Sequence, residues 1–376
     1  MSHLSPEVDT YFFAIRYLEN NFGGYFRTLL DRAYKIMDRK TKSISASGPN
    51  AVGHKNVFTA VTTAVYDLFT KKEQIPPLSP DICIDGKTCL VTGANSGLGK
   101  AVAIQLAQRG GRVIMACRSG IPEAGEDVKR LSGNPNIEMM QVDLSDLKSI
   151  HHFCDQLKEK NIKLDIVISN AGLMPLNARK SPQGFELMFA VHFMANRLMV
   201  ERWLKDGVIN PAKKGESAPR IVFVSSEAHQ SSEPIDFQTF GEFVDFGLKD
   251  GLKHYAYTKL HLCTFAQELS RRTNPSEQTE IAVHSLCPGP IASNIARESP
   301  AFIKPLLAPI MKLLFRTPEQ AAEPVIYLAC SPEMGQRTGA YFHMMREKTA
   351  SPLATDTQNG TELWQKSEVL LNESYS

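Results

Sequence analysis

Residues 88–100 read Thr-Cys-Leu-Val-Thr-Gly-Ala-Asn-Ser-Gly-Leu-Gly-Lys. The first five residues are an apolar run typical of a buried strand, and a helix pattern follows the last glycine. Gly93, Gly97 and Gly99 stand between the two elements with the spacing G-x-x-x-G-x-G. Three glycines alone indicate only a turn, but between a strand and a helix they let backbone N–H groups approach a phosphate. The stretch therefore predicts a phosphate-binding loop at the start of an α/β region.

Strand-like and helix-like segments alternate from residue 86 onward. The strand-like segments are 88–92, 112–116, 137–142, 164–169, 220–225 and 280–286. Helix-like stretches at 100–109 and 145–160 separate the early ones. Near-continuous apolar strands that alternate with helices are typical of a parallel sheet covered on both faces. We predict an α/β, doubly wound parallel sheet in a domain spanning residues 81–348.

The first 80 residues differ from the rest, because they hold 11 of the 31 aromatic residues. We expect an extension of two amphipathic helices there, packed on its own domain or in a homodimer in preference to a partner or a membrane surface. Pro76-Pro77-Leu78-Ser79-Pro80 marks its boundary with the main domain. Residues 349–376 are predicted to form a tail with a short helix at 362–371.

The bulk composition narrows the function classes. The chain has 376 residues, a net charge of +2 and seven cysteines without a C-x-x-C pair. So small a charge gives no electrostatic case for binding nucleic acid, and we predict no metal site. Unclustered cysteines in odd number are typical of reduced core thiols. No segment reaches the roughly 20 apolar residues of a membrane-spanning helix, and no signal-peptide pattern is present. We expect a cytoplasmic protein, with peripheral membrane contact left open.

The second strand-like segment ends at Arg118. In dinucleotide-binding folds an acidic residue at this strand end bonds the ribose hydroxyls of NAD, whereas an arginine favours the 2′-phosphate of NADP. A solvated surface arginine is the alternative interpretation. Arg118 thus favours NADP(H) as the cofactor.

A second motif, Y-x-x-x-K, places Tyr255 and Lys259 one helical turn apart on the same face. A nearby ammonium favours the phenolate and can bring the tyrosine pKa toward the range that acid/base catalysis needs. The motif alone occurs by chance in many surface helices. Ser226, Asn170-Ala171-Gly172 and Cys287-Pro288-Gly289, however, also follow predicted strands, and ligands bind at that edge of open α/β sheets. The shared edge favours a catalytic site.

These residues resemble the short-chain dehydrogenase/reductase pattern in order and context over residues 84–341. The resemblance implies a seven-stranded Rossmann-type sheet in which Tyr255 is the catalytic acid/base, Lys259 activates it and binds ribose, and Ser226 polarises the substrate oxygen. It also implies that Asp143 and Leu144 line the adenine pocket, and that Ile291 and Ser293 hold the nicotinamide. The implied cofactor-binding residues are Gly93, Asn95, Ser96, Gly97, Leu98, Gly99, Arg118, Asp143, Leu144, Asn170, Ala171, Gly172, Tyr255, Lys259, Pro288, Gly289, Ile291 and Ser293.

Within that family the chain is most similar to the retinol dehydrogenase branch, which also resembles the WW-domain oxidoreductase. Ala116-Cys117-Arg118, the 29-residue interval from Ser226 to Tyr255 and the late run 317–322 carry this similarity. Such relatives imply NADP(H) and a hydrophobic alcohol or carbonyl substrate, retinol-, steroid- or lipid-like. The resemblance also suggests that the apolar run 302–315 covers the substrate, although core packing explains that run equally well.

One position departs from the family pattern, because His192 stands where relatives carry an asparagine that helps to hold a proton-relay water. Histidine also binds water and relays protons, so an altered but working relay through His192 is the preferred interpretation. The alternative is a packed helix histidine and a weakened relay. A second hypothesis follows: an NADP(H)-binding scaffold or regulator with weakened catalysis, whose N-terminal helices bind a partner. The intact Ser226, Tyr255 and Lys259 favour the enzyme.

Overall fold

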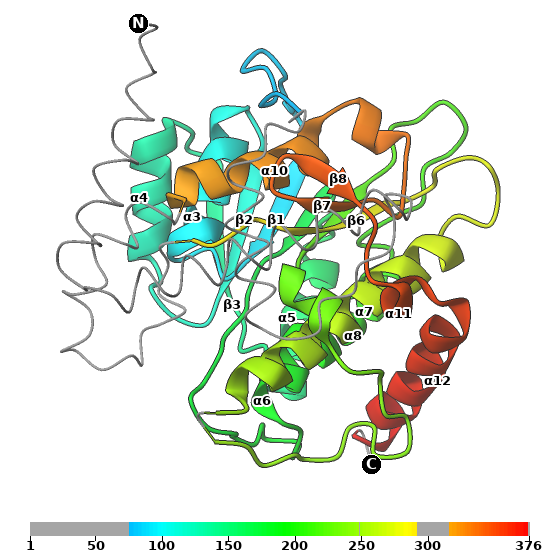
Figure 1. Cartoon of the computed structure of the whole chain (residues 1–376). Helices are drawn as coiled ribbons and strands as arrows, with labels where there is room; N and C mark the ends of the chain where they lie inside the picture. The colour runs from blue at the N-terminus through cyan, green and yellow to red at the C-terminus, as the bar shows by residue number, and fades with distance from the viewer. Residues whose placement is uncertain (1–74, 248, 292–315, 375–376) are drawn as a thin grey trace, which may run out of the picture. The chain divides into compact units, whose positions relative to one another are not determined.

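The computed structural model describes residues 75–247, 249–291 and 316–374, which build a central sheet with helices on both faces (Figure 1). The strand order is β3-β2-β1-β4-β5-β6-β7-β8. The strands are β1 (Thr88–Thr92), β2 (Arg112–Cys117), β3 (Ile137–Gln141), β4 (Ile166–Ser169), β5 (Arg220–Val224), β6 (Ala282–Cys287), β7 (Tyr341–His343) and β8 (Arg346–Lys348). Pairing is parallel from β3 to β7, and β8 pairs antiparallel with β7. The predicted doubly wound parallel sheet is confirmed.

Two layers of helices enclose this sheet (Figure 1). One layer contains α3 (Gly97–Gln108), α4 (Glu123–Ser132) and α10 (Pro318–Cys330). The other contains α5 (Leu147–Glu159), α7 (Ala195–Lys205) and α8 (Gly251–Arg272). Shorter elements are α6 (Leu187–Phe189), the π-helical turn η1 (Ala190–Met194), the 3₁₀ turns η2 (Glu227–Ser231) and η4 (Glu333–Gly335), and α11 (Pro352–Thr355), which α12 (Thr357–Glu373) follows.

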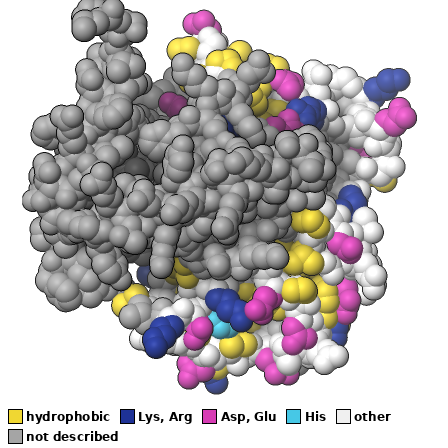
Figure 2. Space-filling view, viewed as in Figure 1, with side chains coloured by type: hydrophobic (Ala, Val, Ile, Leu, Met, Phe, Trp, Pro, Cys, Tyr) yellow, Lys and Arg dark blue, Asp and Glu magenta, His cyan; other side chains and the backbone are white. Residues whose placement is uncertain are grey.

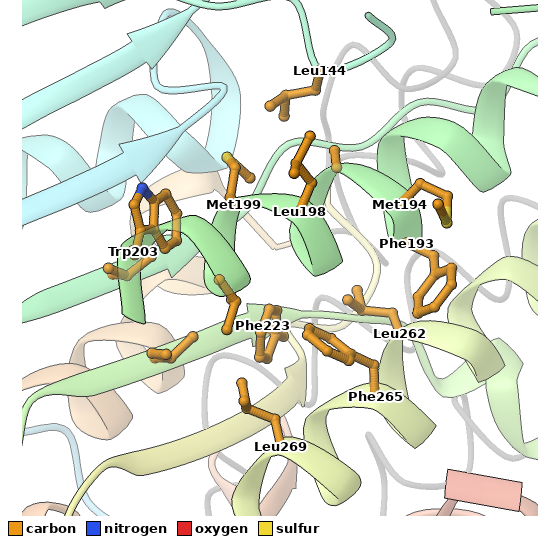
Figure 3. Close-up of a cluster of buried hydrophobic side chains, with 14 of the residues drawn as sticks. Leu144, Phe193, Met194, Leu198, Met199, Trp203, Phe223, Leu262, Phe265 and Leu269 are labelled. Atoms are coloured by element: carbon orange, nitrogen blue, oxygen red, sulfur yellow. The ribbon is translucent and has the colours of Figure 1, made fainter. Parts of the chain in front are cut away.

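Each helix layer has its own apolar core because successive strand side chains point to opposite faces of the sheet. In β1, Cys89 and Val91 pack with the α3 and α10 side, whereas Leu90 packs with the α7 and α8 side. Figure 3 shows the second core, where Phe223 of β5 faces Phe265 of α8 with ring centroids 5.7 Å apart. Both faces of the strands are therefore buried, which explains their unbroken apolar sequences.

The C-terminal tail is a packed part of this body, and its helix is longer than predicted. Asp356 caps α12 by accepting the Asn359 N–H at 2.8 Å. Trp364 of α12 stacks on Phe265 and lies under the guanidinium groups of Arg197 and Arg272, at 4.1 and 4.5 Å from the ring centroid. The tail thus covers the outer surface of α8.

Some predictions fall partly or wholly outside the described residues. The N-terminal helices, predicted within residues 1–74, lie outside the described residues. So do Ser293 and the whole apolar run 302–315. The proline-rich boundary lies against the main body, since the Arg109 guanidinium donates to the Ser79 and Leu78 carbonyls at 2.7 and 3.2 Å. Within the described ranges, no helix is both long and apolar enough to cross a membrane.

Candidate active site

A pocket of about 650 Å³ opens at the carboxyl ends of the parallel strands. The loops that follow β1 to β6 line it, together with two residues of α8. All of the predicted cofactor-binding residues that the structure describes lie in its wall, and so does Ser226. The predicted residues therefore meet in one cavity, although the first and last of them, Gly93 and Ile291, are 198 positions apart in the sequence.

The glycine loop turns sharply out of β1 and leads directly into α3. Gly93 has a φ of +65°, a conformation that suits glycine, and its N–H donates to Ala116 at 2.8 Å. A Cβ on Gly99 would overlap the Gly93 carbonyl oxygen and the Asn170 amide. Ser96 precedes α3 without a side-chain cap, which leaves the helix N-terminus available to an anion at the pocket wall. The loop fits a dinucleotide pyrophosphate.

Side-chain hydrogen bonds join this loop to its neighbours. Thr92 Oγ1 accepts the N–H groups of Asn170 and Ala171, both at 3.0 Å, and Asn170 Nδ2 donates to the Thr92 carbonyl at 2.9 Å. Asn95 Nδ2 donates to the Ser119 carbonyl at 3.1 Å. These bonds fix the ends of β1, β2 and β4 around the same space.

Two predicted cofactor residues on the far side of the loop differ in their surroundings. The Asp143 carboxylate accepts the N–H and hydroxyl of Ser145 at 2.9 and 2.6 Å, so it also stabilises the turn after β3. Arg118 is exposed at the pocket wall. It makes no ion pair with the described residues, which leaves its guanidinium available to a phosphate of a ligand.

The three predicted catalytic side chains meet at the other end of the pocket. The Ser226 side chain lies near the Tyr255 phenol and lowers its pKa, and both residues line the pocket. Lys259 Nζ lies 5.6 Å from the centroid of the Tyr255 ring and donates to the Val224 carbonyl at 3.0 Å. Ser226 Oγ also accepts the Ala228 N–H at 3.2 Å, as the cap of η2. A phenol, a hydroxyl and an ammonium are thus held together at the cavity wall.

Burial controls the ionisation of this group. It raises the pKa of Tyr255, which the Ser226 side chain opposes. Burial lowers the pKa of Lys259 from 10.5 to about 8. At neutral pH Tyr255 therefore holds its proton and Lys259 is mostly charged. Such a pair can donate a proton to an oxygen placed beside it in the pocket.

His192 is fully buried behind the pocket wall and does not line it. Its Nε2 accepts the Leu173 N–H at 3.1 Å, and its Nδ1 lies 2.9 Å from Thr258 Oγ1. Because the Thr258 hydroxyl donates to the Tyr255 carbonyl at 3.1 Å, Nδ1 carries the hydrogen. Both ring nitrogens are thus used, and burial lowers the pKa of His192 well below its usual value, with Lys259 adding to the effect.

Several wall residues were missed from the sequence, and most of them directly flank a predicted motif. They are Ala116, Cys117, Ser119, Val142, Leu173, Met174, Pro175, Arg179, Val224, Ser225, Cys287 and Pro290. Leu187 and Val191 also line the pocket from α6 and η1. Leu187 and Val191 are four residues apart, so they share one face of a helix. Their position next to the candidate residue His192 was the sequence signal that could have placed them at the pocket.

Comparisons with known proteins agree with this geometry. Residues 87–236 match the short chain dehydrogenase family. Retinol dehydrogenase 13 of Mus musculus is 36% identical over 297 residues, which cover 77% of this chain and 84% of that protein. Retinol dehydrogenase 14 of Homo sapiens is 33% identical over 305 residues, covering 76% and 86%.

The fold has counterparts among solved structures. A crystal structure of an uncharacterized protein from Mycobacterium Paratuberculosis superposes with a TM-score of 0.60 at 23% identity, and covers 79% of this chain and 98% of that one. At this identity the match shows a shared fold. The sequence matches go further, because they extend over most of both chains. The chain therefore belongs to the short-chain dehydrogenase/reductase family and is an oxidoreductase that uses a nicotinamide cofactor.

Proposed function

We propose that this oxidoreductase interconverts a hydrophobic alcohol and its aldehyde or ketone with NADP(H). The observation that carries the proposal is the meeting of Ser226, Tyr255 and Lys259 in the wall of the cavity that the glycine loop also lines. The bound nicotinamide supplies or accepts the hydride. Ser226 holds the substrate oxygen, and Tyr255 gives that oxygen a proton during reduction and removes it during oxidation. Lys259 stabilises the phenolate left on Tyr255.

NADP(H) is preferred in this proposal because of Arg118. Its exposed side chain stands at the end of β2, where a 2′-phosphate on the adenosine ribose is recognised in related folds. A guanidinium can bind a phosphate through two parallel hydrogen bonds. An unphosphorylated ribose offers no matching charge.

The proposed substrate is apolar, of a retinol-, steroid- or lipid-like kind. Leu173, Met174, Leu187 and Val191 line the pocket with apolar groups. The two matched relatives are named retinol dehydrogenases, which supports the same class of substrate.

We infer that the reaction takes place in the cytoplasm, a reducing compartment, since six of the seven cysteines are buried free thiols.

For His192 the geometry supports the packed histidine over the water-binding relay. A water on either ring nitrogen would displace Leu173 or Thr258. We therefore assign His192 as a brace that joins the loop after β4 to α8, which carries Tyr255 and Lys259. In this role His192 holds the loop after β4 at a fixed position relative to α8, and it transfers no proton itself.

A panel of aldehydes and ketones of increasing apolar size, each assayed with NADPH and with NADH, tests the proposal. We expect turnover that rises with apolar size and favours NADPH. The competing hypothesis is a cofactor-binding scaffold with weak catalysis. Tight NADPH binding without reduction of any compound would support the scaffold and reject the enzyme. Better turnover with NADH would reject the role of Arg118.

A further inference from the structure

The 3₁₀ turn η2 directly follows Ser226, and three of its polar side chains, those of Glu227, His229 and Gln230, bind one distant segment. Glu227 accepts the Tyr341 hydroxyl at 2.8 Å and the Lys348 ammonium at 3.1 Å. Gln230 Nε2 donates to the Thr349 carbonyl at 3.0 Å. The segment that receives these contacts spans residues 341–351 and lies more than 110 positions later in the chain.

His229 joins Ser226, the residue before η2, to the segment 341–351 through its side chain. Its Nδ1 lies 2.7 Å from the Ser226 carbonyl oxygen, and its Nε2 accepts the Ser351 N–H at 3.1 Å. Because the carbonyl only accepts, Nδ1 carries the hydrogen. The His229 N–H also donates to the same Ser226 carbonyl, at 3.2 Å. Two donors from one residue therefore fix the peptide plane that follows Ser226.

Packing holds the ring of His229 in this position. The side chain is fully buried, and the ring lies edge-on to Tyr341 with centroids 4.8 Å apart. Tyr341 is the residue whose hydroxyl binds Glu227. The contacts of Glu227 and His229 thus form one connected network around the turn, in which each ring or carboxylate limits the movement of the next.

The same C-terminal part of the chain also supports α8. Ser351 caps the N-terminus of α11, and α12 follows α11 and lies along α8 (Figure 1). Leu363 and Leu371 of α12 are buried in the core that α8 shares, and Trp364 stacks on Phe265 of α8. The C-terminal part of the chain thus contacts both catalytic elements. Its residues 341–351 hold the turn after Ser226, and its helix α12 packs on α8, which carries Tyr255 and Lys259.

We propose that residues 341–373 form a positioning element of the active site, and that His229 is the positioning residue through which they fix Ser226. The inference rests on the proposed role of Ser226 in holding the substrate oxygen. His229 touches neither the pocket nor its ligands, since it does not line the cavity. It acts by setting the direction of the Ser226 hydroxyl relative to Tyr255.

A matched pair of buried histidines tests this inference in the full-length enzyme. His229→Leu removes the two side-chain bonds, to the Ser226 carbonyl and from the Ser351 N–H, and leaves the backbone bond to Ser226 in place. His284→Leu is the control, because His284 is equally buried, binds the Met334 carbonyl at 2.9 Å and does not line the pocket. A misplacement of reacting groups by about 1 Å costs about 100-fold in rate. We expect kcat to fall about 10- to 100-fold in His229→Leu and less than twofold in His284→Leu.

Two further readouts separate positioning from general loss of stability. The dissociation constant for NADPH should stay unchanged in His229→Leu, since the glycine loop is untouched. His229→Gln keeps one donor and one acceptor and should recover most of the lost kcat. The inference is overturned if His229→Leu loses no more kcat than His284→Leu, or if NADPH binding weakens in parallel with kcat.

Hydrogen exchange keeps the test independent of turnover. Deuterium uptake should accelerate at residues 225–232 and 349–356 together in His229→Leu, and at neither in His284→Leu. Acceleration at one segment alone contradicts the link, even in an enzyme for which no substrate is found. If His229→Leu does not fold, Tyr341→Phe removes only the hydroxyl on Glu227. It should lower kcat about 3- to 10-fold, the effect of one hydrogen bond, and an unchanged kcat would overturn the inference.

Discussion

The two ends of the pocket are built in different ways. The cofactor end consists of strand-end loops whose fit depends on glycines, backbone N–H groups and bonds between neighbouring strands, as with Thr92 and Asn170. The catalytic end depends on buried side chains from distant elements, where His192 and His229 each bind two partners. Substitutions at the two ends should therefore separate binding from turnover.

Figure 2 adds that charged side chains are dispersed among apolar and neutral ones on the described part of the visible face. The polar groups that matter for the catalytic end are inside the molecule. His192, His229 and Lys259 are at most 3% exposed. The catalytic end therefore depends on buried polar groups, whereas the exposed Arg118 is the charged group proposed to act at the cofactor end.

The largest expected effect is a loss of turnover without a loss of cofactor binding. Tyr255→Phe removes the pocket hydroxyl that, in the proposed mechanism, donates the proton. We expect kcat to fall about 10²- to 10⁴-fold, the usual contribution of a general acid. The dissociation constant for NADPH, measured by fluorescence titration, should change less than twofold. Loss of NADPH affinity together with kcat would show that the two ends are not separable.

The next effect concerns the brace between the two ends. His192→Leu leaves the Leu173 N–H without its acceptor and Thr258 without its donor. Each buried unpaired group costs about 1–3 kcal/mol, so the loss of two partners should lower the free energy of unfolding by about 2–6 kcal/mol in urea titration. His192→Gln, which keeps one donor and one acceptor, is the control and should lose less. Equal stability of the leucine variant and the wild type would exclude the brace.

A smaller effect is confined to the cofactor end. Arg118→Ala should weaken NADPH binding about 10- to 100-fold, because hydrogen bonds to charged groups contribute about 1.5–3 kcal/mol. NADH binding and kcat with saturating cofactor should stay within twofold of the wild type. Titration calorimetry with both nucleotides measures this. An equal loss for NADH would mean that Arg118 has a general structural role.

The smallest effect is a pH dependence. Burial lowers the pKa of Lys259 to about 8, so its ammonium loses the proton as the pH rises through that value. In the proposed mechanism carbonyl reduction needs the charged lysine beside Tyr255, so kcat should fall toward tenfold per pH unit above about pH 8. In Lys259→Arg the charge persists, and the residual activity should show no such decline. A flat wild-type profile from pH 7 to 9.5 would contradict this role.

The fold could be predicted well from the sequence because local signals agreed with one another. The six strands before residue 290 were all predicted, with bounds that differ by at most two residues. β7 and β8 were missed because each has three residues and includes a charged or ionisable side chain such as His343 or Arg346. Such short strands form only against a neighbour that already exists.

The candidate site was predicted to the extent that its residues follow strands. Glycine loops, strand-end hydroxyls and a helical Tyr–Lys pair have spacings that sequence reveals. The roles of Thr258 and His229 could not be predicted, because each depends on a partner brought close only by folding, His192 or Ser351. His192 illustrates the limit: its chemistry allows a proton relay, and only the neighbours of its two nitrogens favour a brace.

The position of residues 341–351 also bears on the order of synthesis. The described pocket wall is complete once Ile291 has been made, but Ser351, which fixes His229, follows 60 residues later. At about 5–20 residues per second this interval lasts about 3–12 s on the ribosome. During that time a growing chain already contains every described group that lines the nucleotide site, while Ser226 lacks its anchor.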